Sequence, residues 1–213
     1  MHREMSQLLS KAKGQHKDII CAFIDIRGFS AFCETIESPN VGRFVVRVYQ
    51  EILNKYFPAP SYFKTTGDGM LIIYSYDGPE YELLLNNVVS ASCALVSMFP
   101  NFFRSDPIIN FAVPTEIGIG ISRGPACELV SEGKTIDYSG RILNLAARLM
   151  NMARPLGVVF DASLGYGFLE ENQRKQFEKK NVFVRGISED KPIEVYSTKH
   201  FTEIPAEYLR PHN

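Results

Sequence analysis

The feature that most constrains this chain is one carboxylate inside an apolar run. Residues 19–26 have the composition of a strand buried on both faces, and Asp25 is the only acid among them. Burying an unpaired carboxylate costs several kcal/mol, so such an acid usually has a cation beside it. The turn that follows, Arg27-Gly-Phe-Ser30, offers backbone N–H groups that can bind an anion. The pattern indicates a metal-bound phosphate site; the plain alternative is an aspartate that caps its own turn.

Composition is that of an ordinary soluble globular protein. The 213 residues suit one domain, and a net charge of −1 gives no support for nucleic acid as a partner. Cys21 and Cys93 lie in apolar runs, as expected of buried thiols in a reducing compartment. Residues 1–17 lack a signal-peptide core, and no apolar run reaches the ~18 residues that span a bilayer. We therefore expect a cytoplasmic protein without membrane contacts.

The order of predicted elements favours a ferredoxin-like sandwich. Apolar spacing predicts a short helix near residues 5–12, a strand at 18–26, a helix at 41–57, a hairpin within 62–76 and a helix at 80–98. It then predicts a hairpin of 114–122 with 126–130, a helix at 141–153, a strand at 157–161, a charged helical segment at 167–180, and strands at 181–185 and 192–196. This order is typical of an α+β fold with a ferredoxin-like βαββαβ core in a single domain.

Two further stretches can supply chemistry. Asp68 lies in Gly67-Asp-Gly69, which alone is explained by a hairpin turn. In a ferredoxin-like sheet, however, the first strand and this hairpin bring Asp25 and Asp68 to one edge. Two acids beside an anion-binding turn fit two Mg²⁺ or Mn²⁺ ions with a nucleoside triphosphate. Asn144 and Arg148 share a helix face, for which the alternative is an exposed polar stripe.

Lys64 and Asp137 stand just ahead of two of these motifs, and each alone would be a solvated charge. Together, the motifs resemble the class III nucleotidyl cyclases. The matching segments are Phe23-Ile-Asp-Ile-Arg-Gly-Phe-Ser30, Lys64-Thr-Thr-Gly-Asp-Gly69, Asp137-Tyr-Ser-Gly140 and Asn144-Leu-Ala-Ala-Arg148. The resemblance implies a catalytic domain at residues 18–198, after a lead-in of residues 1–17 and before a tail of residues 199–213.

The resemblance assigns a role to each motif. The expected metal ligands are Asp25, Ile26 through its backbone carbonyl, and Asp68, and the expected triphosphate-binding residues are Gly28, Phe29, Ser30 and Arg185. Two divalent ions, Mn²⁺ or Mg²⁺, are implied at each site. Asn144 is expected to orient the ribose, and Arg148 to neutralise charge that develops at the α-phosphate. The products are a 3′,5′-cyclic nucleotide and pyrophosphate, formed without a covalent enzyme intermediate.

Active sites of these cyclases lie between two catalytic domains. This chain has the residues of both halves, so the resemblance implies a homodimer with two shared sites. The substrate is a nucleoside triphosphate, and the cyclic product is expected to act on a separate effector protein. A catalytically dead nucleotide-binding module is a remote alternative, because such modules usually lose a metal aspartate or the arginine. A palm-type nucleotidyl transferase would lack the Asn-x-x-x-Arg helix.

Two arguments about the base point in different directions. Lys64 and Asp137 match the pair that contacts adenine in adenylyl cyclases, which makes an adenylate cyclase of bacterial signalling the alternative hypothesis. The compact architecture resembles the stand-alone pyrimidine cyclases of Pycsar anti-phage systems, whose pockets need bulky groups to select a small base. Candidate groups near such a pocket are Tyr49, Tyr62, Phe63, Arg43 and Arg47. On this basis we favour a uridylate cyclase that makes cyclic UMP for anti-phage defence.

Overall fold

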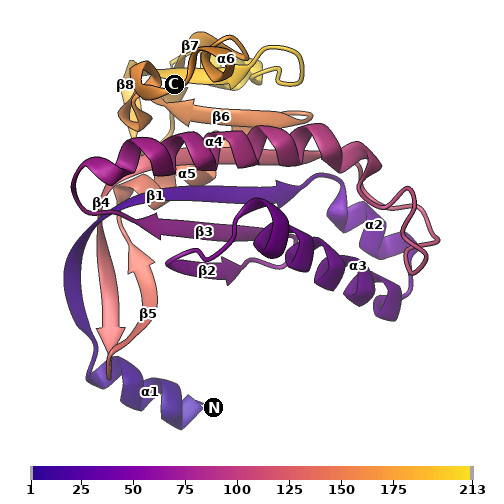
Figure 1. Ribbon diagram of the computed structural model, residues 1–213, viewed down its shortest axis with the longest axis horizontal. Coiled ribbons are helices and arrows are strands. Elements are labelled where there is room, and N and C mark those ends of the chain that lie inside the picture. The colour runs from indigo at the N-terminus through magenta and orange to yellow at the C-terminus, as the bar shows by residue number, and fades with distance from the viewer. Residues whose placement is uncertain (1, 212–213) are drawn as a thin grey trace.

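One mixed β-sheet with helices on both faces makes up the protein (Figure 1). The computed structural model describes residues 2–211. The strands are β1 (Lys13–Ile26), β2 (Tyr62–Thr65), β3 (Gly69–Ser75), β4 (Ile117–Ser131), β5 (Lys134–Ser139), β6 (Gly157–Asp161), β7 (Phe177–Val184) and β8 (Ser188–Thr198). The α-helices are α1 (His2–Ser10), α2 (Phe29–Thr35), α3 (Ser38–Glu51), α4 (Tyr81–Met98), α5 (Arg141–Met152) and α6 (Glu171–Arg174).

The first part of the sheet has the predicted ferredoxin-like core. The sheet order is β2-β3-β1-β4-β6-β8-β7, and β5 pairs with the far part of β4. Within the core, β1 pairs in antiparallel fashion with β3 and with β4, and β2 and β3 form a hairpin. The connections run through α3 and α4, so the chain follows the β-α-β-β-α-β order and the α+β prediction is confirmed. β6 then joins β4 in parallel, and β8 and β7 complete the sheet.

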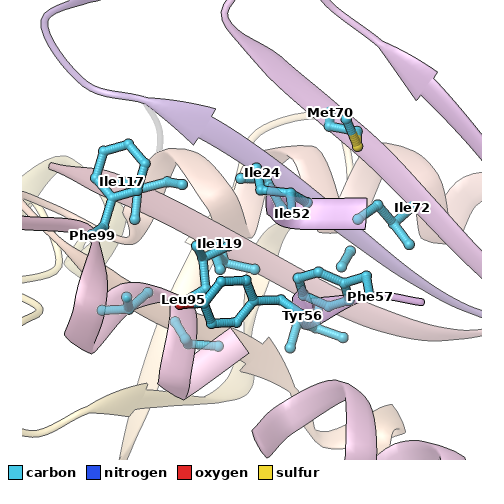
Figure 2. Packing of buried hydrophobic residues seen from close by; sticks show 14 of the residues in the cluster. Ile24, Ile52, Tyr56, Phe57, Met70, Ile72, Leu95, Phe99, Ile117 and Ile119 are labelled. Atoms are coloured by element: carbon cyan, nitrogen blue, oxygen red, sulfur yellow. The ribbon is translucent and has the colours of Figure 1, made fainter. Parts of the chain in front are cut away.

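Apolar side chains fill both faces of this sheet. On one face, α3, the π-helical turn Ile52–Tyr56 and α4 pack on β1, β3 and β4 (Figure 2). Ile24, Met70 and Ile119 from the strands and Leu95 from α4 meet in this core. On the other face, α5 buries its apolar side against β1, β4, β6, β7 and β8. Helices therefore close both faces of the sheet.

α4 is long and apolar enough to cross a membrane, by length and composition alone. Its segment, Gly78–Asn101, has a mean hydropathy of 1.5 over its most apolar stretch. The helix nevertheless packs on the sheet, where Leu85, Val88 and Leu95 are buried in the main core. A helix that is apolar on most sides is typical of a protein core as well as of a membrane. We interpret α4 as the core helix of the domain.

β4 differs most from the prediction. The sequence predicts a hairpin that turns at Arg123-Gly-Pro125, whereas Ile117–Ser131 is one strand that pairs with β1 along its length. Around Pro125, β4 has a partner on one side only, because its pairing with β6 ends at Ile121 and its pairing with β5 begins at Cys127. A proline without an N–H is tolerated at such an open edge. The hairpin prediction is therefore wrong.

Three shorter segments also differ from the prediction. Residues 135–139, to which the sequence pattern assigns no helix or strand, belong to β5. The charged helix predicted at residues 167–180 is limited to α6, and β7 begins at Phe177, which is buried against Phe160. α2 has no counterpart among the predicted elements. The strands predicted at residues 181–185 and 192–196 lie in β7 and β8.

An arm extends from the body of the sheet. The first part of β1, the second part of β4 and β5 form this arm, and α1 lies at its tip (Figure 1). Lys11, just after α1, pairs with Glu132 between β4 and β5 at 2.6 Å. The helix predicted near residues 5–12 is therefore present, and β1 joins it directly to the body of the protein.

Candidate active site

Two acids meet at the end of β1. Asp25 lies opposite Gly69 of β3, and Asp68 is the residue just before that strand. The backbone N–H of Ile26 donates to the carbonyl oxygen of Asp68 at 3.1 Å, which holds the turn against β1. The fold thus brings Asp25 and Asp68 to one edge of the sheet, as the sequence predicts.

β3 approaches β1 closely here because Gly69 has no side chain. A Cβ on Gly69 would lie 2.1 Å from the carbonyl oxygen of Ile24. We expect Gly69→Ala to lower the free energy of unfolding by about 1–3 kcal/mol, because overpacking moves the two strands apart. Thermal unfolding measures this loss as a lower Tm. Gly42→Ala in α3 is the matched control, since its Cβ meets open space; equal melting temperatures for the two variants would contradict the prediction.

The surroundings of Asp25 disfavour a bare carboxylate. Burial is the largest influence and raises the pKa of Asp25 above its usual value. Arg27 opposes this rise, and the negative charge of Asp68 adds to it. Two carboxylates that share a site repel each other, and a divalent cation between them relieves the repulsion.

The donor atoms at this edge fit a divalent ion that binds together with a phosphate. Asp25, Asp68 and the carbonyl of Ile26 offer oxygen only, the donor that Mg²⁺ and Mn²⁺ prefer. Among residues 2–211, no group of three or more His, Cys, Asp or Glu side chains could hold a metal by itself. Mg²⁺ usually takes one or two carboxylates and completes its shell with water and substrate phosphates. The site therefore fits ions whose coordination the substrate completes.

The predicted anion-binding turn is the start of α2. Gly28 has φ 71° and ψ 10°, in the left-handed region that favours glycine, and Phe29 is the first helical residue. Gly28 and Ser30 are exposed, whereas Phe29 packs on Phe44 with ring centroids 6.5 Å apart. The free N–H groups of this turn follow directly after the strand that carries Asp25. The triphosphate role of Gly28, Phe29 and Ser30 stays a prediction that this placement favours.

Asn144 and Arg148 belong to α5, on its outer face. Both are exposed, while Leu145 and Leu149 are buried beneath them, as the helical spacing predicts. α5 lies close against β4 because a Cβ on Gly120 would come within 2.1 Å of the α5 backbone. Among the described residues, no hydrogen bond or ion pair joins this polar face to the two acids of β1 and β3.

Lys64 of β2 and Asp137 of β5 form an ion pair. Lys64 Nζ donates to Asp137 Oδ2 at 2.7 Å, and the Tyr62 hydroxyl donates to Asp137 Oδ1 at 3.3 Å. Burial pushes the pKa of Asp137 upward, but the hydrogen bond from Lys64 and that from the backbone N–H of Tyr138 hold it below its usual value. The same hydrogen bond raises the pKa of Lys64. The structure therefore brings together two residues that are 73 positions apart in the sequence.

Tyr49 lies beside the turn that carries Asp68. Its hydroxyl donates to the carbonyl oxygen of Gly67 at 2.7 Å, and burial, with the charge of Asp68, raises its pKa. Tyr49 thus contacts the turn of Asp68, a predicted metal ligand. Within the part of the chain that the structure describes, it is not hydrogen-bonded to Lys64 or Asp137, the predicted base-reading pair. Arg47 is held by Asp106, to which its Nη2 and Nε donate at 2.5 and 3.1 Å.

Arg185 lies in the turn between β7 and β8, where it is exposed. Val184, just before it, packs in one cluster with Leu149 and Met152 of α5. The Arg185 turn is therefore tied to the helix of Asn144. Its role on the terminal phosphates stays a prediction.

The structure adds Arg27 to the site. Arg27 Nη1 donates to Asp25 Oδ2 at 2.5 Å, and the side chains are 7% and 22% exposed, respectively. The sequence reasoning treats Arg27 only as part of the turn. Two signals could have found it, because a buried acid needs a cation and because residues i and i+2 of an extended chain share a face.

A family model for the adenylate and guanylate cyclase catalytic domain matches residues 12–200 of this sequence. The chain belongs to this family. The matched residues include Asp25 and Asp68, the ion pair of Lys64 and Asp137, and the exposed face of α5 with Asn144 and Arg148. The protein is a class III nucleotidyl cyclase, and related catalytic domains act as dimers on nucleotides with divalent metal ions. A search of curated proteins by sequence returns no match.

Solved structures of cyclase domains share the fold. The adenylyl cyclase CyaB from P. aeruginosa is 18% identical, with a TM-score of 0.69 over 90% of this chain and 100% of that chain. The guanylate cyclase domain of RhGC from Catenaria anguillulae, in complex with GTP, is 14% identical, with a TM-score of 0.64 over 89% of this chain and 100% of that chain. A bacterial light-regulated adenylyl cyclase is 22% identical, with a TM-score of 0.64 over 90% of this chain and 54% of that chain.

Proposed function

We propose that the protein is a homodimeric nucleotidyl cyclase with two active sites shared between the subunits. One observation carries the proposal: each subunit brings Asp25 and Asp68 together at the end of β1 but presents Asn144 and Arg148 separately, on the exposed face of α5. Neither the two acids nor the pair of Asn144 and Arg148 would form a complete active site alone. A two-fold partner would place the acids of one subunit opposite the α5 face of the other.

Each half has its own task in this proposal. Asp25 and Asp68, with the Ile26 carbonyl, would hold two divalent ions, Mn²⁺ or Mg²⁺. Such ions lower the pKa of the ribose 3′-hydroxyl and neutralise triphosphate charge. Gly28, Phe29 and Ser30 bind the β- and γ-phosphates through N–H and O–H donors, and Arg185, whose turn packs with α5, adds its guanidinium from the α5 half. The listed groups bind and orient the triphosphate, and none acts as a covalent nucleophile.

The α5 half completes the reaction geometry. Asn144 orients the ribose so that its 3′-oxygen faces the α-phosphorus, and Arg148 donates to the α-phosphate oxygens where negative charge develops. The 3′-hydroxyl loses its proton to solvent, and its oxygen forms a bond to the α-phosphorus. The bond between the α-phosphorus and the oxygen that bridges to the β-phosphate breaks, and pyrophosphate leaves with that oxygen and the electron pair. Because both residues are exposed in the free subunit, they are available to a nucleotide held by the partner.

ATP is the substrate that the base-reading residues support best. The ion pair of Lys64 and Asp137 places an ammonium beside a carboxylate, a donor and an acceptor that match a ring nitrogen and the exocyclic amine of adenine. A uracil carbonyl would need a donor such as one of the two candidate arginines, Arg43 or Arg47. Arg47 is already bound to Asp106. Arg43 donates to Asn40 Oδ1 at 3.3 Å. The product would then be cyclic AMP, a second messenger for a separate effector protein in the cytoplasm.

UTP is the second candidate, and Tyr62 favours it. The Tyr62 hydroxyl donates to Asp137 Oδ1 at 3.3 Å, so this ring lies at the predicted base-reading pair, where a bulky group would narrow the nucleotide site. A narrower site suits a pyrimidine. In that case the protein would be a uridylate cyclase that makes cyclic UMP as a second messenger for anti-phage defence.

One assay tests these proposals together. The purified protein is incubated with Mn²⁺, or with Mg²⁺, and with each of ATP, GTP, CTP and UTP, and the products are identified by mass. We expect cyclic AMP as the main product. We also expect Asp137→Ala to slow its formation by about 10–100-fold, the effect of one lost charged hydrogen bond, whereas Asp190→Ala on exposed β8 changes nothing. If cyclic UMP is the main product, the substrate is UTP and not ATP. If none of the four nucleotides gives a cyclic product, the cyclase proposal is refuted.

A further inference from the structure

Arg27 has a buried side chain that contacts two separate parts of the protein. Its Nη1 donates to Asp25 Oδ2 at 2.5 Å. Its Nη2 donates to the carbonyl oxygens of Met150 and Ala153, the latter at 3.2 Å. These carbonyls are at the C-terminal end of α5, 123 and 126 positions away in the sequence. One guanidinium therefore joins the strand of the acids to the helix of the polar face.

The fold leaves a slot for this guanidinium. Gly118 of β4 lies opposite Asp25, and a Cβ there would be 2.0 Å from Arg27 Nη2 and 2.8 Å from the carbonyl oxygen of Ala153. Any other residue at Gly118 would displace either Arg27 or the end of α5. Gly118 of β4 thus leaves room for both the Arg27 guanidinium and the end of α5.

Arginine suits this place for a physical reason. The last carbonyls of a helix have no partner within the helix and carry a partial negative charge. A planar guanidinium can donate to them and to a carboxylate at once, through different nitrogens, which a compact ammonium cannot do. Water could satisfy the end of an exposed helix without a buried charge. The contact with Asp25 is what distinguishes Arg27 from an ordinary helix cap.

We propose that Arg27 is a positioning residue that fixes the Asp25 carboxylate and the end of α5 relative to each other. This inference rests on the proposed function, in which Asp25 serves one active site of the dimer and α5 serves the other. Within each subunit, Arg27 then couples the two sites, because a shift of Asp25 is passed to the helix that carries Asn144 and Arg148. Arg27 does this without contacting the reacting atoms.

Mixing subunits tests the coupling. Asp68→Asn and Arg148→Ala subunits, mixed equally, should recover about a quarter of wild-type activity, since half of the dimers are mixed and each has one intact site. Asp68→Asn is the acid variant here because it leaves Asp25, the partner of Arg27, in place. We expect Arg27→Met to lose about 10²-fold in activity, the typical effect of a small misplacement. Because both halves are disturbed, Arg27→Met should recover a quarter with neither partner. Recovery with Arg148→Ala would limit Arg27 to Asp25, and recovery with Asp68→Asn would limit it to α5; either result overturns the coupling.

Arg27→Lys keeps the test decisive if Arg27→Met folds poorly. A lysine can pair with Asp25 but cannot also hold the carbonyls of α5. We expect Arg27→Lys to recover about a quarter of wild-type activity with Asp68→Asn subunits and much less with Arg148→Ala subunits, by the same counting of dimers. Equal recovery with both partners would contradict the proposal.

Hydrogen–deuterium exchange gives a readout that needs neither metal nor nucleotide. We expect residues 150–154 to exchange at least tenfold faster in Arg27→Met, because the end of α5 loses its anchor. Arg154→Met is the matched control: Arg154 lies at the same helix end, is exposed, and donates through Nε to the Asn151 carbonyl. Wild-type exchange in Arg27→Met would refute the anchor. If the Asp68→Asn and Arg148→Ala mixture recovers nothing, the shared sites are refuted, and the exchange result still decides on Arg27.

Discussion

Asp68→Asn should abolish cyclic nucleotide formation without destabilising the protein. We expect a loss of at least about 10³-fold in turnover, because an amide is a poor ligand for a divalent ion and the second carboxylate of the site is gone. The fold should be unaffected, since the charge of Asp68 raises the pKa of Asp25, a sign of repulsion between the two acids. Product formation with Mn²⁺ and thermal unfolding of the metal-free protein measure the two effects.

The companion variant Asp25→Asn separates catalysis from stability. It should be as inactive as Asp68→Asn, but it also removes the carboxylate that pairs with the buried guanidinium of Arg27. Leaving that charge without its partner should cost on the order of 3 kcal/mol. Asp77→Asn, an exposed acid after β3, is the control and should resemble wild type in both measurements. Near-normal turnover in Asp68→Asn would rule out the proposed metal site.

Arg148→Ala should lose about 10²–10³-fold in turnover, as expected when a preorganised donor to a transition-state charge is removed. Its Tm should stay at the wild-type value, because the side chain is exposed and the buried face of α5 is unchanged. Arg141→Ala is the matched control, since Arg141 is exposed at the other end of the same helix. The measurement is product formation at saturating nucleotide, together with a melting curve.

The mixture of Arg148→Ala with Asp68→Asn subunits extends this prediction to the assembly. Recovery of about a quarter of wild-type activity from two inactive proteins is expected only for sites shared across a two-fold axis. Each protein alone stays inactive at every concentration. A mixture that remains inactive, although the subunits exchange, would mean that one subunit contains a complete site.

The spacing of apolar residues predicts best those elements whose formation depends least on residues far away in the sequence. The spacing of apolar residues locates α4 and α5, and it assigns Leu145 and Leu149 correctly to the buried face. It fails at Gly124-Pro125, because the residues that normally make a turn are kept extended by pairing with β1 more than 100 positions away. It also misassigns residues 177–180, where three successive charged residues, Glu178, Lys179 and Lys180, resemble an exposed helix.

Some contacts of the candidate site could likewise be predicted from the sequence, and others could not. The meeting of Asp25 and Asp68 follows from strand order alone, since the ferredoxin-like topology makes β1 and β3 neighbours. The pair of Lys64 and Asp137 could be suggested only by resemblance, because β5 was absent from the predicted elements. The contact of Arg27 with the end of α5 could not be predicted, because it depends on how closely a helix lies over β4.

The length of β1 has a practical consequence. At about 3.3 Å per residue, the contour length of its 14 residues is roughly 45 Å, and the strand bends where the arm leaves the body of the sheet (Figure 1). α1 is attached at one end of this strand and Asp25 lies near the other, and pairing with β4 continues along its length. A label or fused protein at the N-terminus would therefore be covalently continuous with the strand that carries Asp25, a predicted metal ligand.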